Sequence, residues 1–597
     1  MRRRRVRTSP PLHPFRQQGE RNGPNVRNED VADAFDEMAD LLAIQGENPF
    51  RIRAYRRAAQ VVRSLPRDLA EIDSAEELDA LPGIGADLAA KILELRNTGR
   101  LGALETLRRR VPPGLRDLLR LPGLGPARVR TLRERLKISG IDDLRRALSA
   151  GRLRGVPGFG PGIESRIRSA LAERASSEAR VPRPVAARYA EPLRAYLKAL
   201  PGVTHVEVAG SYRRGRDTVG DLDIVVCSRP STDPIQALRG YEDLRDLTAA
   251  GPTKAMGVLR NGLQVDIRVV TPESYGAALH YFTGSREYNI RIRRRARDRG
   301  YKLNEYGLFR GNRRVAGATE RELLNALGLP WIAPELREDR GEIEAAERNA
   351  LPTLVERRDL RGDLHAHTDA SDGRESLEKM AAAAKAAGLE YLAITDHSRY
   401  IGIVHGLDAG RLARQADAID ALNERLKGLV LLKGVEVDIL EDGSLALPDA
   451  VLRRLDVVVA SVHSHFDLPR AKQTARLLRA LDRPCVSILG HPTGRLLGER
   501  AGCAVDFDRV LEAARERPCY VEINGQPSRL DLDDVHARAA RDHGVLVSIA
   551  SDAHGGADLA FLDHGVMQAR RGWLRREDVL NARPLKELRE LLRRTMR

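Results

Sequence analysis

Two aspartates lie two positions apart in an alternating apolar pattern, and this spacing is typical of a metal site. Asp221 and Asp223 alternate with Leu222 and Ile224. On a β-strand, both carboxylates then point out of one face while the apolar side chains point into the core. Adjacent carboxylates repel each other and are costly to desolvate, so a divalent cation between them is the favoured explanation.

The residues before this strand indicate what the cation would carry. Gly210 and Ser211 form a turn that offers backbone N–H groups and a hydroxyl, and Arg213 and Arg214 add positive charge. Such a turn at the edge of a sheet suits an anion. A metal-bound triphosphate fits these residue types.

A third acid completes the arrangement. The segment 262–270 places Val265, Ile267 and Val269 on one face and Asp266 on the other. Three acids on neighbouring strands make a two-metal site, in which one ion activates a 3′-hydroxyl and the other binds the triphosphate and stabilises the leaving pyrophosphate. Acids that end strands at solvent-facing turns would explain either strand alone, but not both strands together with the turn.

A second series of metal-ligand residue types occupies the C-terminal part of the chain. Apolar runs alternate there with amphipathic helices, which indicates a parallel βα series closed into a barrel. The runs lie near residues 391–394, 429–437, 457–462, 486–489, 520–523 and 545–549. Candidate ligands at or near strand ends are His365, His367, Asp372, His397, Glu436, His463, His491, Asp552 and His554.

Barrels of this kind place their chemistry at the C-terminal ends of the strands. One such histidine could be a hydrogen-bonded core residue, but packing does not explain a histidine or an acid at almost every strand end. Mixed imidazole and carboxylate ligands suit Mn, Zn or Fe rather than Mg alone.

Composition restricts the partner and the compartment. The chain has 597 residues, which suggests about four domains, and a formal charge of +16, which points to a polyanion such as nucleic acid. A general preference for Arg over Lys explains part of that charge but not its distribution. Four cysteines without a CxxC pair indicate a reducing cytosol.

The N-terminus and the hydropathy exclude membrane classes. Residues 1–7 are basic with no apolar segment after them, so they are not a secretory signal, and residues 1–28 are expected to be a disordered basic tail. No apolar run approaches the ~18 residues that a membrane span needs.

Three glycine-rich segments have similar sequences, and each predicts a helix, a tight turn and a second helix. They are residues 81–92, 121–132 and 156–167. Such a turn exposes backbone N–H groups at a helix N-terminus, which can hold a DNA phosphate without reading bases. The glycines expected to contact DNA are Gly83, Gly85, Gly123, Gly125, Gly158 and Gly160.

These segments resemble the helix-hairpin-helix motif of DNA-repair proteins. Many ordinary helix pairs turn on glycine, so one copy would be weak, but three copies reduce that alternative to a minor one. By the resemblance, the turn carbonyls near Leu81, Ile84, Leu121 and Leu124 would hold a Na⁺ or K⁺ ion.

The segment 48–59 is similar to the small N-terminal domain of family X DNA polymerases, the polymerase beta group. In members with deoxyribose-phosphate lyase activity, a lysine after the first hairpin forms a Schiff base. Lys91 matches that position, and Tyr55 matches a supporting tyrosine. Two further lysines expected around the pocket are replaced by Arg51 and Asp87. Two roles therefore stay open for Lys91: lyase nucleophile or phosphate contact.

The acids and the glycine–serine turn match the nucleotidyltransferase superfamily. The resemblance implies that Asp221 and Asp223 bind both ions, and that Asp266 holds the catalytic ion and helps to deprotonate the primer. The implied nucleotide contacts in this part of the chain are Arg180, Gly210, Ser211, Arg214 and Gly220.

The YFTGS segment, 281–285, places an aromatic pair in an expected turn. Taken alone, such a pair favours core packing. The whole YFTGS segment resembles the family X segment that contacts the incoming sugar and base. By that resemblance Tyr281 and Phe282 exclude a 2′-hydroxyl and Gly284 allows close approach. Asn289 and Arg293 match a minor-groove contact and a template-side contact.

The phrases HAHTDASDG, ITDHS, GVEVDI, SVHSH, GHPTGR and SDAH resemble the PHP domain, named for polymerase and histidinol phosphatase. PHP proteins bind three metals and hydrolyse phosphoesters. Where many relatives carry Cys, this chain has His491, which is also found in the family. By the same resemblance His465 contacts phosphate, and Asp396 orients His397.

The sequence therefore predicts a multidomain chain with α-helical helix-hairpin-helix domains, an α+β nucleotidyltransferase palm with a small α+β thumb-like subdomain, and a C-terminal (β/α)7-type PHP barrel. The expected boundaries are 1–28 for the tail, 29–110 for the lyase-like domain, 111–178 for a DNA-binding domain, 179–275 for the palm, 276–335 for the thumb-like subdomain, 336–357 for a linker and 358–597 for the barrel.

The implied function is a DNA polymerase that fills short gaps in base-excision or end repair, with a metal-dependent 3′-5′ exonuclease and possible AP-endonuclease or lyase activity. Mg²⁺ or Mn²⁺ would serve the polymerase site, and three Mn²⁺, or Zn²⁺ or Fe, would serve the barrel. Expected partners are gapped or nicked DNA and dNTPs, with no membrane, for a monomer in the cytoplasm. The alternative is a PHP nuclease or phosphoesterase whose polymerase half only binds DNA.

Overall fold

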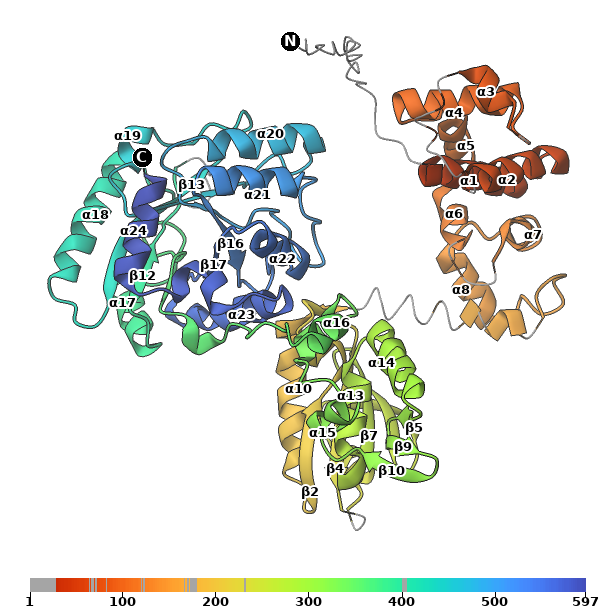
Figure 1. Ribbon diagram of the computed structural model, residues 1–597, viewed down its shortest axis with the longest axis horizontal. Helices are drawn as coiled ribbons and strands as arrows, with labels where there is room; N and C mark the ends of the chain where they lie inside the picture. The colour runs from red at the N-terminus through yellow and green to blue at the C-terminus, as the bar shows by residue number, and fades with distance from the viewer. Residues whose placement is uncertain are drawn as a thin grey trace, which may run out of the picture. The chain divides into compact units, whose positions relative to one another are not determined.

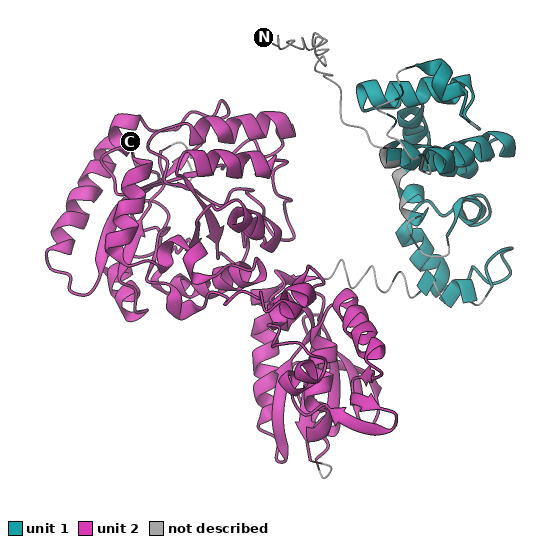
Figure 2. Cartoon of the chain, in the orientation of Figure 1, with its two compact units in different colours: residues 1–178 teal, residues 179–597 magenta. Residues whose placement is uncertain are grey.

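The computed structural model divides the chain into two compact units, residues 1–178 and 179–597 (Figure 2). It describes residues 28–596 except 64, 66–68, 70–71, 73, 82, 120, 122–123, 161, 166, 169–170, 172–179, 230–231 and 400–404. The predicted tail, 1–28, thus lies outside the described residues apart from Asn28, which begins the first helix. No helix in the described residues is long and apolar enough to cross a membrane.

In the described residues of the first unit, the regular elements are all helices, as the glycine-punctuated sequence predicts (Figure 1). Phe35 and Tyr55 pack edge to face in its core, with ring centroids 5.7 Å apart. The helices are α1 (Asn28–Gln45), α2 (Pro49–Arg63), α3 (Ala75–Asp79), α4 (Ala86–Thr98), α5 (Gly102–Arg110), α6 (Pro113–Leu119), α7 (Pro126–Leu136) and α8 (Ile141–Ser149).

The three predicted hairpin turns share one backbone pattern. In each turn the N–H of a buried apolar residue donates to the carbonyl three positions earlier, as Ile84 does to Leu81 at 3.0 Å. Leu124 and Phe159 repeat this bond in the second and third turns. Gly83 has a φ of +96°, a left-handed conformation that glycine adopts without steric cost. The same backbone geometry therefore precedes the second helix of each predicted hairpin.

The second unit begins with a five-stranded sheet in the order β2-β4-β7-β6-β5 (Figure 1). Strands β4 and β7 run parallel, and the other neighbours are antiparallel. Alternating side chains such as Leu222 and Val265 form the apolar core beneath the sheet. The elements are β1 (Val181–Pro182), α10 (Arg183–Lys198), β2 (Val203–Val208), α11 (Gly210–Arg213), β3 (Thr218–Val219), β4 (Asp221–Ser228), α12 (Pro234–Leu238), β5 (Leu244–Ala250), β6 (Lys254–Leu259) and β7 (Gln264–Val270).

A smaller helical and antiparallel subdomain follows the sheet. Its elements are η2 (Pro272–Ser274), α13 (Tyr275–Thr283), α14 (Arg286–Asp298), β8 (Lys302–Asn304), β9 (Gly307–Arg310), β10 (Arg313–Ala316), α15 (Glu320–Ala326), η3 (Pro334–Leu336), α16 (Glu342–Glu347) and η4 (Arg357–Asp359). The segment expected to be a linker is packed rather than solvated, since the side chains of Arg337 and Glu342 are fully buried.

The C-terminal part is a seven-stranded parallel sheet in sequential order, β11 to β17. A parallel bridge between Ala366 and Ala553 joins its two ends, so the barrel is nearly closed, as predicted. Its elements are β11 (Gly362–Asp363), α17 (Leu377–Ala386), β12 (Tyr391–Ile394), α18 (Ala409–Asn423), β13 (Val430–Asp438), α19 (Asp449–Leu452), β14 (Val457–Ser461), α20 (Arg470–Leu481), β15 (Ile488–Leu489), α21 (Phe507–Glu516), β16 (Tyr520–Asn524), α22 (Asp534–Asp542), β17 (Val547–Ala550), η5 (Gly556–Phe561), α23 (Leu562–Arg571), η6 (Arg576–Asp578), η7 (Leu580–Ala582) and α24 (Leu585–Thr595).

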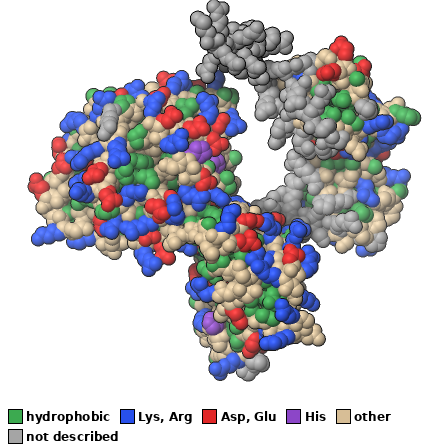
Figure 3. Space-filling view, in the orientation of Figure 1, with side chains coloured by type: hydrophobic (Ala, Val, Ile, Leu, Met, Phe, Trp, Pro, Cys, Tyr) green, Lys and Arg blue, Asp and Glu red, His purple; other side chains and the backbone are tan. Residues whose placement is uncertain are grey.

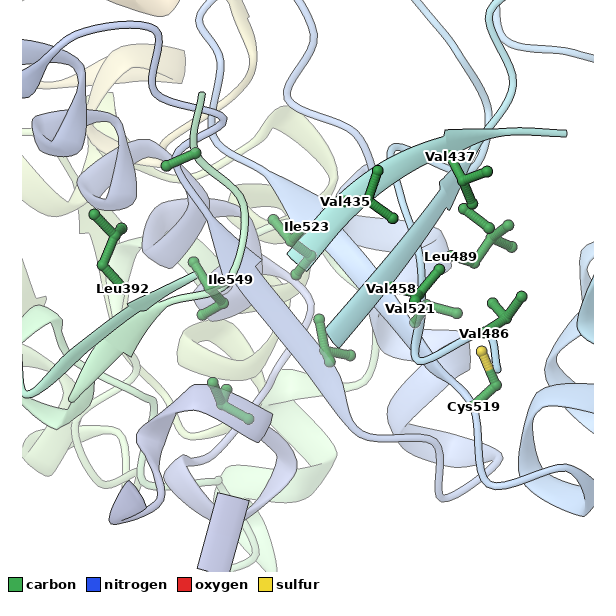
Figure 4. Packing of buried hydrophobic residues seen from close by; sticks show 14 of the residues in the cluster. Leu392, Val435, Val437, Val458, Val486, Leu489, Cys519, Val521, Ile523 and Ile549 are labelled. Atoms are coloured by element: carbon green, nitrogen blue, oxygen red, sulfur yellow. The ribbon is translucent and has the colours of Figure 1, made fainter. Parts of the chain in front are cut away.

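The barrel strands are buried on both faces, which explains their nearly continuous apolar runs. Val435 and Val458 belong to the cluster that packs against the surrounding helices (Figure 4). Val457 and Val459 belong to a second cluster, together with Leu588 of α24. Polar side chains within these strands, such as Glu436, are therefore held in a rigid apolar frame.

Two candidate metal centres

The first centre lies where β4 and β7 run side by side. Asp223 and Asp266 are register partners across this parallel pair, and Asp221 precedes Asp223 on the same polar face of β4. A Cβ added to Gly210 would lie 2.2 Å from an oxygen of Asp223, so a larger residue there would displace that carboxylate. The φ of +58° at Gly210 is a left-handed conformation, which also favours glycine at this position. The sequence indicated a turn at Gly210 and Ser211, but both residues begin the short helix α11.

The electrostatics of this centre favour a cation. Burial, followed by the neighbouring charges of Asp221 and Asp266, raises the pKa of Asp223 to about 7. Burial also raises the pKa of Asp221, with Asp266 adding to the effect. The Ser211 hydroxyl is buried without a hydrogen-bond partner among the described residues. Crowded carboxylates, together with a hydroxyl on α11 that lacks a partner among the described residues, fit a divalent ion with a phosphate ligand.

The two arginines that the sequence assigned to positive charge are already paired. Arg213 donates to both carboxylate oxygens of Glu320, at 2.8 and 2.7 Å. Arg214 donates to Glu338 at 3.0 Å and to the carbonyl of Thr283 at 2.8 Å. The sequence did not reveal these partners, because they lie more than 60 residues away along the chain.

Arg180 and Gly220 lie beside the same centre. The Arg180 guanidinium donates to the hydroxyl of Thr218 at 3.0 Å and also to its carbonyl. Burial lowers the pKa of Arg180, and the nearby charge of Asp221 opposes this effect, which places the guanidinium near the acids. Gly220 directly precedes β4 and so leads into Asp221.

The aromatic pair lies in the last turn of α13 rather than in a loop, which corrects the expected turn. The rings of Tyr281 and Phe282 are half-buried with centroids 5.2 Å apart. A Cβ on Gly284 would lie 2.5 Å from the Tyr288 ring. The amide of Asn289 donates to the carbonyls of Tyr281 and Gly284, at 2.7 and 3.1 Å, and so fixes the end of the helix.

Arg293, one turn further along α14 than Asn289, is exposed. Its guanidinium carbon lies 5.9 Å from the centroid of the Tyr281 ring, a cation–π contact that places it beside the aromatic pair. Asn289 and Arg293 thus lie on the side of α14 that faces α13.

The second centre lies at the C-terminal ends of the barrel strands. Among the described residues, three groups of side chains bring their ligand atoms within 4.8 Å of one another. The groups are His367, Asp372, His397 and His554; His365, His367 and Asp552; and His397, Glu436 and His463. Because His367 and His397 are each shared by two groups, the arrangement suits three adjacent ions. Figure 3 shows histidine side chains gathered beside acidic ones on the barrel.

The donor set fits these ions. The buried Nε2 of His365 and Nδ1 of His397 have no hydrogen-bond partner among the described residues. Burial alone would raise the pKa of Glu436, but His397 and His463 hold it well below its usual value. A buried carboxylate kept ionised among imidazoles is the environment of a mixed N/O metal site.

Buried groups behind the cluster set the direction of three imidazoles. The Nδ1 atoms of His365 and His463 lie 3.0 and 2.8 Å from Glu522 and Asp438. The Nδ1 of His554 lies 2.9 Å from the carbonyl of Asp552. Each contact leaves Nε2 for a metal, a common arrangement behind ligating histidines. The sequence did not identify Glu522 and Asp438 as site residues, although an acid inside a buried apolar strand is a usable signal.

The remaining barrel residues lie as follows. The Nε2 of His491 is 2.8 Å from Glu436, which places it at the cluster. Asp396 does not hold His397, because its carboxylate accepts from Thr368 and Ser371 and so fixes the loop after His367. The side chain of His465 is 42% exposed, near Glu441.

The hairpin residues lie in the first unit, apart from Gly123, which is outside the described residues. Gly85 and Gly125 cap α4 and α7, where helix N–H groups are free of intrahelical partners. Gly158 has a φ of +89°, and Gly160 directly follows the third turn.

The ammonium group of Lys91 is paired with the carboxylate of Asp87 one turn earlier on α4. Its side chain is 15% exposed. Tyr55 is buried, and its hydroxyl has no hydrogen-bond partner among the described residues.

The fold and the two centres define a metal-dependent nucleotidyltransferase joined to a metal-dependent phosphoesterase. Family models match each part of the chain in turn. They are a helix-hairpin-helix domain at 26–101, a tandem helix-hairpin-helix at 115–173, the DNA polymerase beta palm at 180–275, the DNA polymerase beta thumb at 278–338 and the PHP domain at 363–526.

Similar proteins link these parts in one chain. The chain is 37% identical over 573 residues to the DNA polymerase/3′-5′ exonuclease PolX of Bacillus subtilis, covering 95% of this chain and 100% of that protein. It is 28% identical over 351 residues to DNA polymerase lambda of Arabidopsis thaliana, covering 53% of this chain and 63% of the relative. It is 31% identical over 231 residues to a probable phosphatase of Thermoanaerobacter, covering 37% of this chain and 89% of the relative. The chain belongs to the bacterial family X DNA polymerases with a C-terminal PHP domain.

Proposed function

We propose that the protein fills short gaps in DNA during base-excision or end repair and trims 3′ ends with its barrel. Polymerase and exonuclease activity are supported by the similarity to PolX along nearly the whole chain. The pairing of Asp223 with Asp266 across β4 and β7 carries the polymerase part of the proposal. The shared-ligand cluster in the barrel carries the exonuclease part.

At the polymerase centre, Asp221, Asp223 and Asp266 would hold two Mg²⁺ or Mn²⁺ ions. When bound, these ions supply charge stabilisation for the attacking and leaving oxygens of an in-line displacement. Asp266 takes up the proton of the primer 3′-hydroxyl. The Ser211 hydroxyl and the backbone N–H groups of α11 bind the triphosphate, because the hydroxyl is buried without a partner among the described residues and the preceding Gly210 packs against Asp223.

The other proposed nucleotide contacts surround this centre. Tyr281 and Phe282 exclude a 2′-hydroxyl, and Gly284 and Asn289 set their position through the end of α13. Arg180, Arg214 and Gly220 complete the phosphate side. Arg293 contacts the template strand.

In the barrel, nine side chains would hold three Mn²⁺ ions, or Zn²⁺ or Fe. They are His365, His367, Asp372, His397, Glu436, His463, His491, Asp552 and His554. Such ions supply Lewis acidity at a phosphoester. Glu522 and Asp438 orient His365 and His463 toward them.

The hairpin glycines bind the phosphates of gapped or nicked DNA, with Na⁺ or K⁺ at the turns. We propose domains at 29–110, 111–178, 179–275, 276–335 and 358–597, in a monomer that acts on the nucleoid in the cytoplasm. Lyase activity is not part of the proposal, because Asp87 and Arg51 replace two lysines expected around the pocket and the carboxylate of Asp87 is paired with the Lys91 ammonium. Lys91 instead contacts phosphate.

Primer extension on DNA with a short gap and a 5′-phosphate tests the polymerase part. Wild-type protein with Mg²⁺ or Mn²⁺ should extend the primer through the gap and stop there. A complete lack of nucleotide addition at every concentration of either ion would leave a nuclease whose polymerase half only binds DNA.

A further inference from the structure

The turn that follows α11 lies directly against the barrel. Gly215 in this turn has a φ of +69°, and a Cβ added to it would lie 2.2 Å from the sulfur of Met567 on α23. At the other end of the turn, Asp217 lies 3.1 Å from the guanidinium of Arg495, a barrel residue. The segment between the phosphate-binding helix and β4 is thus held by the barrel at two points.

Arg571, the last residue of α23, makes the central contact. Its side chain is 3% exposed. One guanidinium nitrogen donates to the carbonyl of Arg214 at 2.7 Å and to Oε1 of Glu338 at 3.0 Å. The other nitrogen donates to Asp534 on α22 at 2.5 Å. A buried guanidinium with three partners in fixed positions is a rigid anchor.

Glu338 joins this anchor to the nucleotide site. Its Oε1 also accepts from Nε of Arg214 at 3.0 Å, so two guanidinium groups share one carboxylate oxygen. Burial would raise the pKa of Glu338, but Arg214 and then Arg571 lower it, so the group is ionised at neutral pH. Its negative charge is divided between Arg214, Arg571 and, at 3.6 Å, Arg216, so Glu338 neutralises Arg214 only in part.

Removal of Arg571 would have two consequences for Arg214. The Arg214 carbonyl would lose its donor, and Glu338 would keep as partners only Arg214 and, at 3.6 Å, the more exposed Arg216. With its buried partner Arg571 gone, the Glu338 carboxylate competes more strongly with a triphosphate for the Arg214 guanidinium. Both consequences weaken the positive potential at the phosphate side of the centre.

We propose that Arg571 of the barrel is a positioning residue for the polymerase site, which holds the Arg214 turn and keeps Glu338 from neutralising Arg214. This inference rests on the proposed polymerase function, since it assigns Arg214 to the triphosphate. The barrel is then a structural part of the polymerase as well as a second catalytic domain.

The test uses the full-length protein on gapped DNA and compares Arg571→Ala with Arg589→Ala, a matched change at an exposed position on α24. We expect the KM for dNTP to rise about ten-fold in Arg571→Ala, with kcat changed less, and to stay unchanged in Arg589→Ala. Exonuclease activity in the same preparation should persist, which shows that the barrel is folded. A KM within two-fold of wild type would overturn the inference.

A double variant separates positioning from simple loss of packing. Adding Glu338→Gln to Arg571→Ala releases Arg214 from its carboxylate, so the KM should fall back toward the wild-type value. If Arg571 had only a structural role, the KM of the double variant should be higher than that of the single variant. That result would contradict the proposal. If Arg571→Ala does not fold, Arg571→Lys is used in its place. Its KM for dNTP should lie between the wild-type value and a ten-fold increase, and a wild-type KM would contradict the proposal. A wild-type protein that fails to extend primers would instead reject the proposed function itself.

Discussion

Asp223 on β4 lies directly opposite Asp266 on β7 in the parallel register of the palm sheet. The contact is unfavourable for the isolated protein, since burial and the neighbouring acids raise the pKa of Asp223 to about 7. A divalent ion held between these carboxylates would relieve the repulsion. Stability and activity are therefore in conflict at Asp266.

Asp266→Asn should reveal that conflict. Primer extension should fall at least about 100-fold, because a metal ligand and proton acceptor is lost. The raised pKa of Asp223 means that the unfolding free energy of the metal-free protein falls as the pH rises from 3.8 to about 7. At pH 8 with a chelator, the variant should thus be about 1 kcal/mol more stable than wild type by thermal unfolding. A less stable variant would refute the repulsion.

Glu320→Gln should destabilise the smaller subdomain and its contact with Arg213 of the palm in a pH-dependent way. Burial would raise the pKa of Glu320, but Arg337 and Arg213 lower it from 4.5 to about 2. The ionised group therefore contributes about 3 kcal/mol of stability above pH 4.5, and this contribution is lost as the pH falls toward 2. In urea unfolding, the difference in unfolding free energy between wild type and variant should have its full value at pH 7 and should decrease between pH 4.5 and 3. A difference independent of pH would contradict this account.

Glu522→Gln tests the orientation of His365 in the barrel. The amide is a weaker acceptor for the imidazole N–H, so metal affinity or exonuclease rate should fall about 10- to 100-fold. Metal content by mass spectrometry and 3′-end degradation are the measurements. Polymerase activity should be unchanged, as should both activities in Glu516→Gln, a change at an exposed site on α21. Full metal content with normal degradation would show that Glu522 has no part in the centre.

Lys91 should fail as a lyase nucleophile. Its ammonium group is paired with the carboxylate of Asp87. Asp87 occupies a position where the resemblance to lyase-active family members predicted a lysine. Borohydride trapping on DNA with a 5′-deoxyribose phosphate should give no adduct that depends on Lys91. An adduct formed by wild type and lost in Lys91→Ala would restore the lyase role.

The sequence predicted the polar faces of the strands well, because alternation with a period of two is a local property. Asp223 and Asp266 were placed on neighbouring strands, and the predicted barrel strands lie close to β12–β17. It missed β11, whose two residues carry too little pattern to be recognised.

The partners of charged side chains were not predictable from the sequence, because long-range contacts leave no local pattern. Arg213 and Arg214 were expected to supply positive charge, and Arg214 to contact phosphate, but the buried acids that hold both were not foreseen. Arg337 was placed in a linker and is fully buried beside Glu320. Asp396 was expected to orient a neighbouring histidine and instead fixes a loop.

Separation of the two activities on one gapped substrate tests the account most directly. With Mg²⁺ or Mn²⁺ and dNTPs, Asp221→Asn should abolish synthesis and leave 3′-end degradation intact. His365→Ala should abolish degradation and leave synthesis intact. If either single change removed both activities, the protein would not have two independent metal centres.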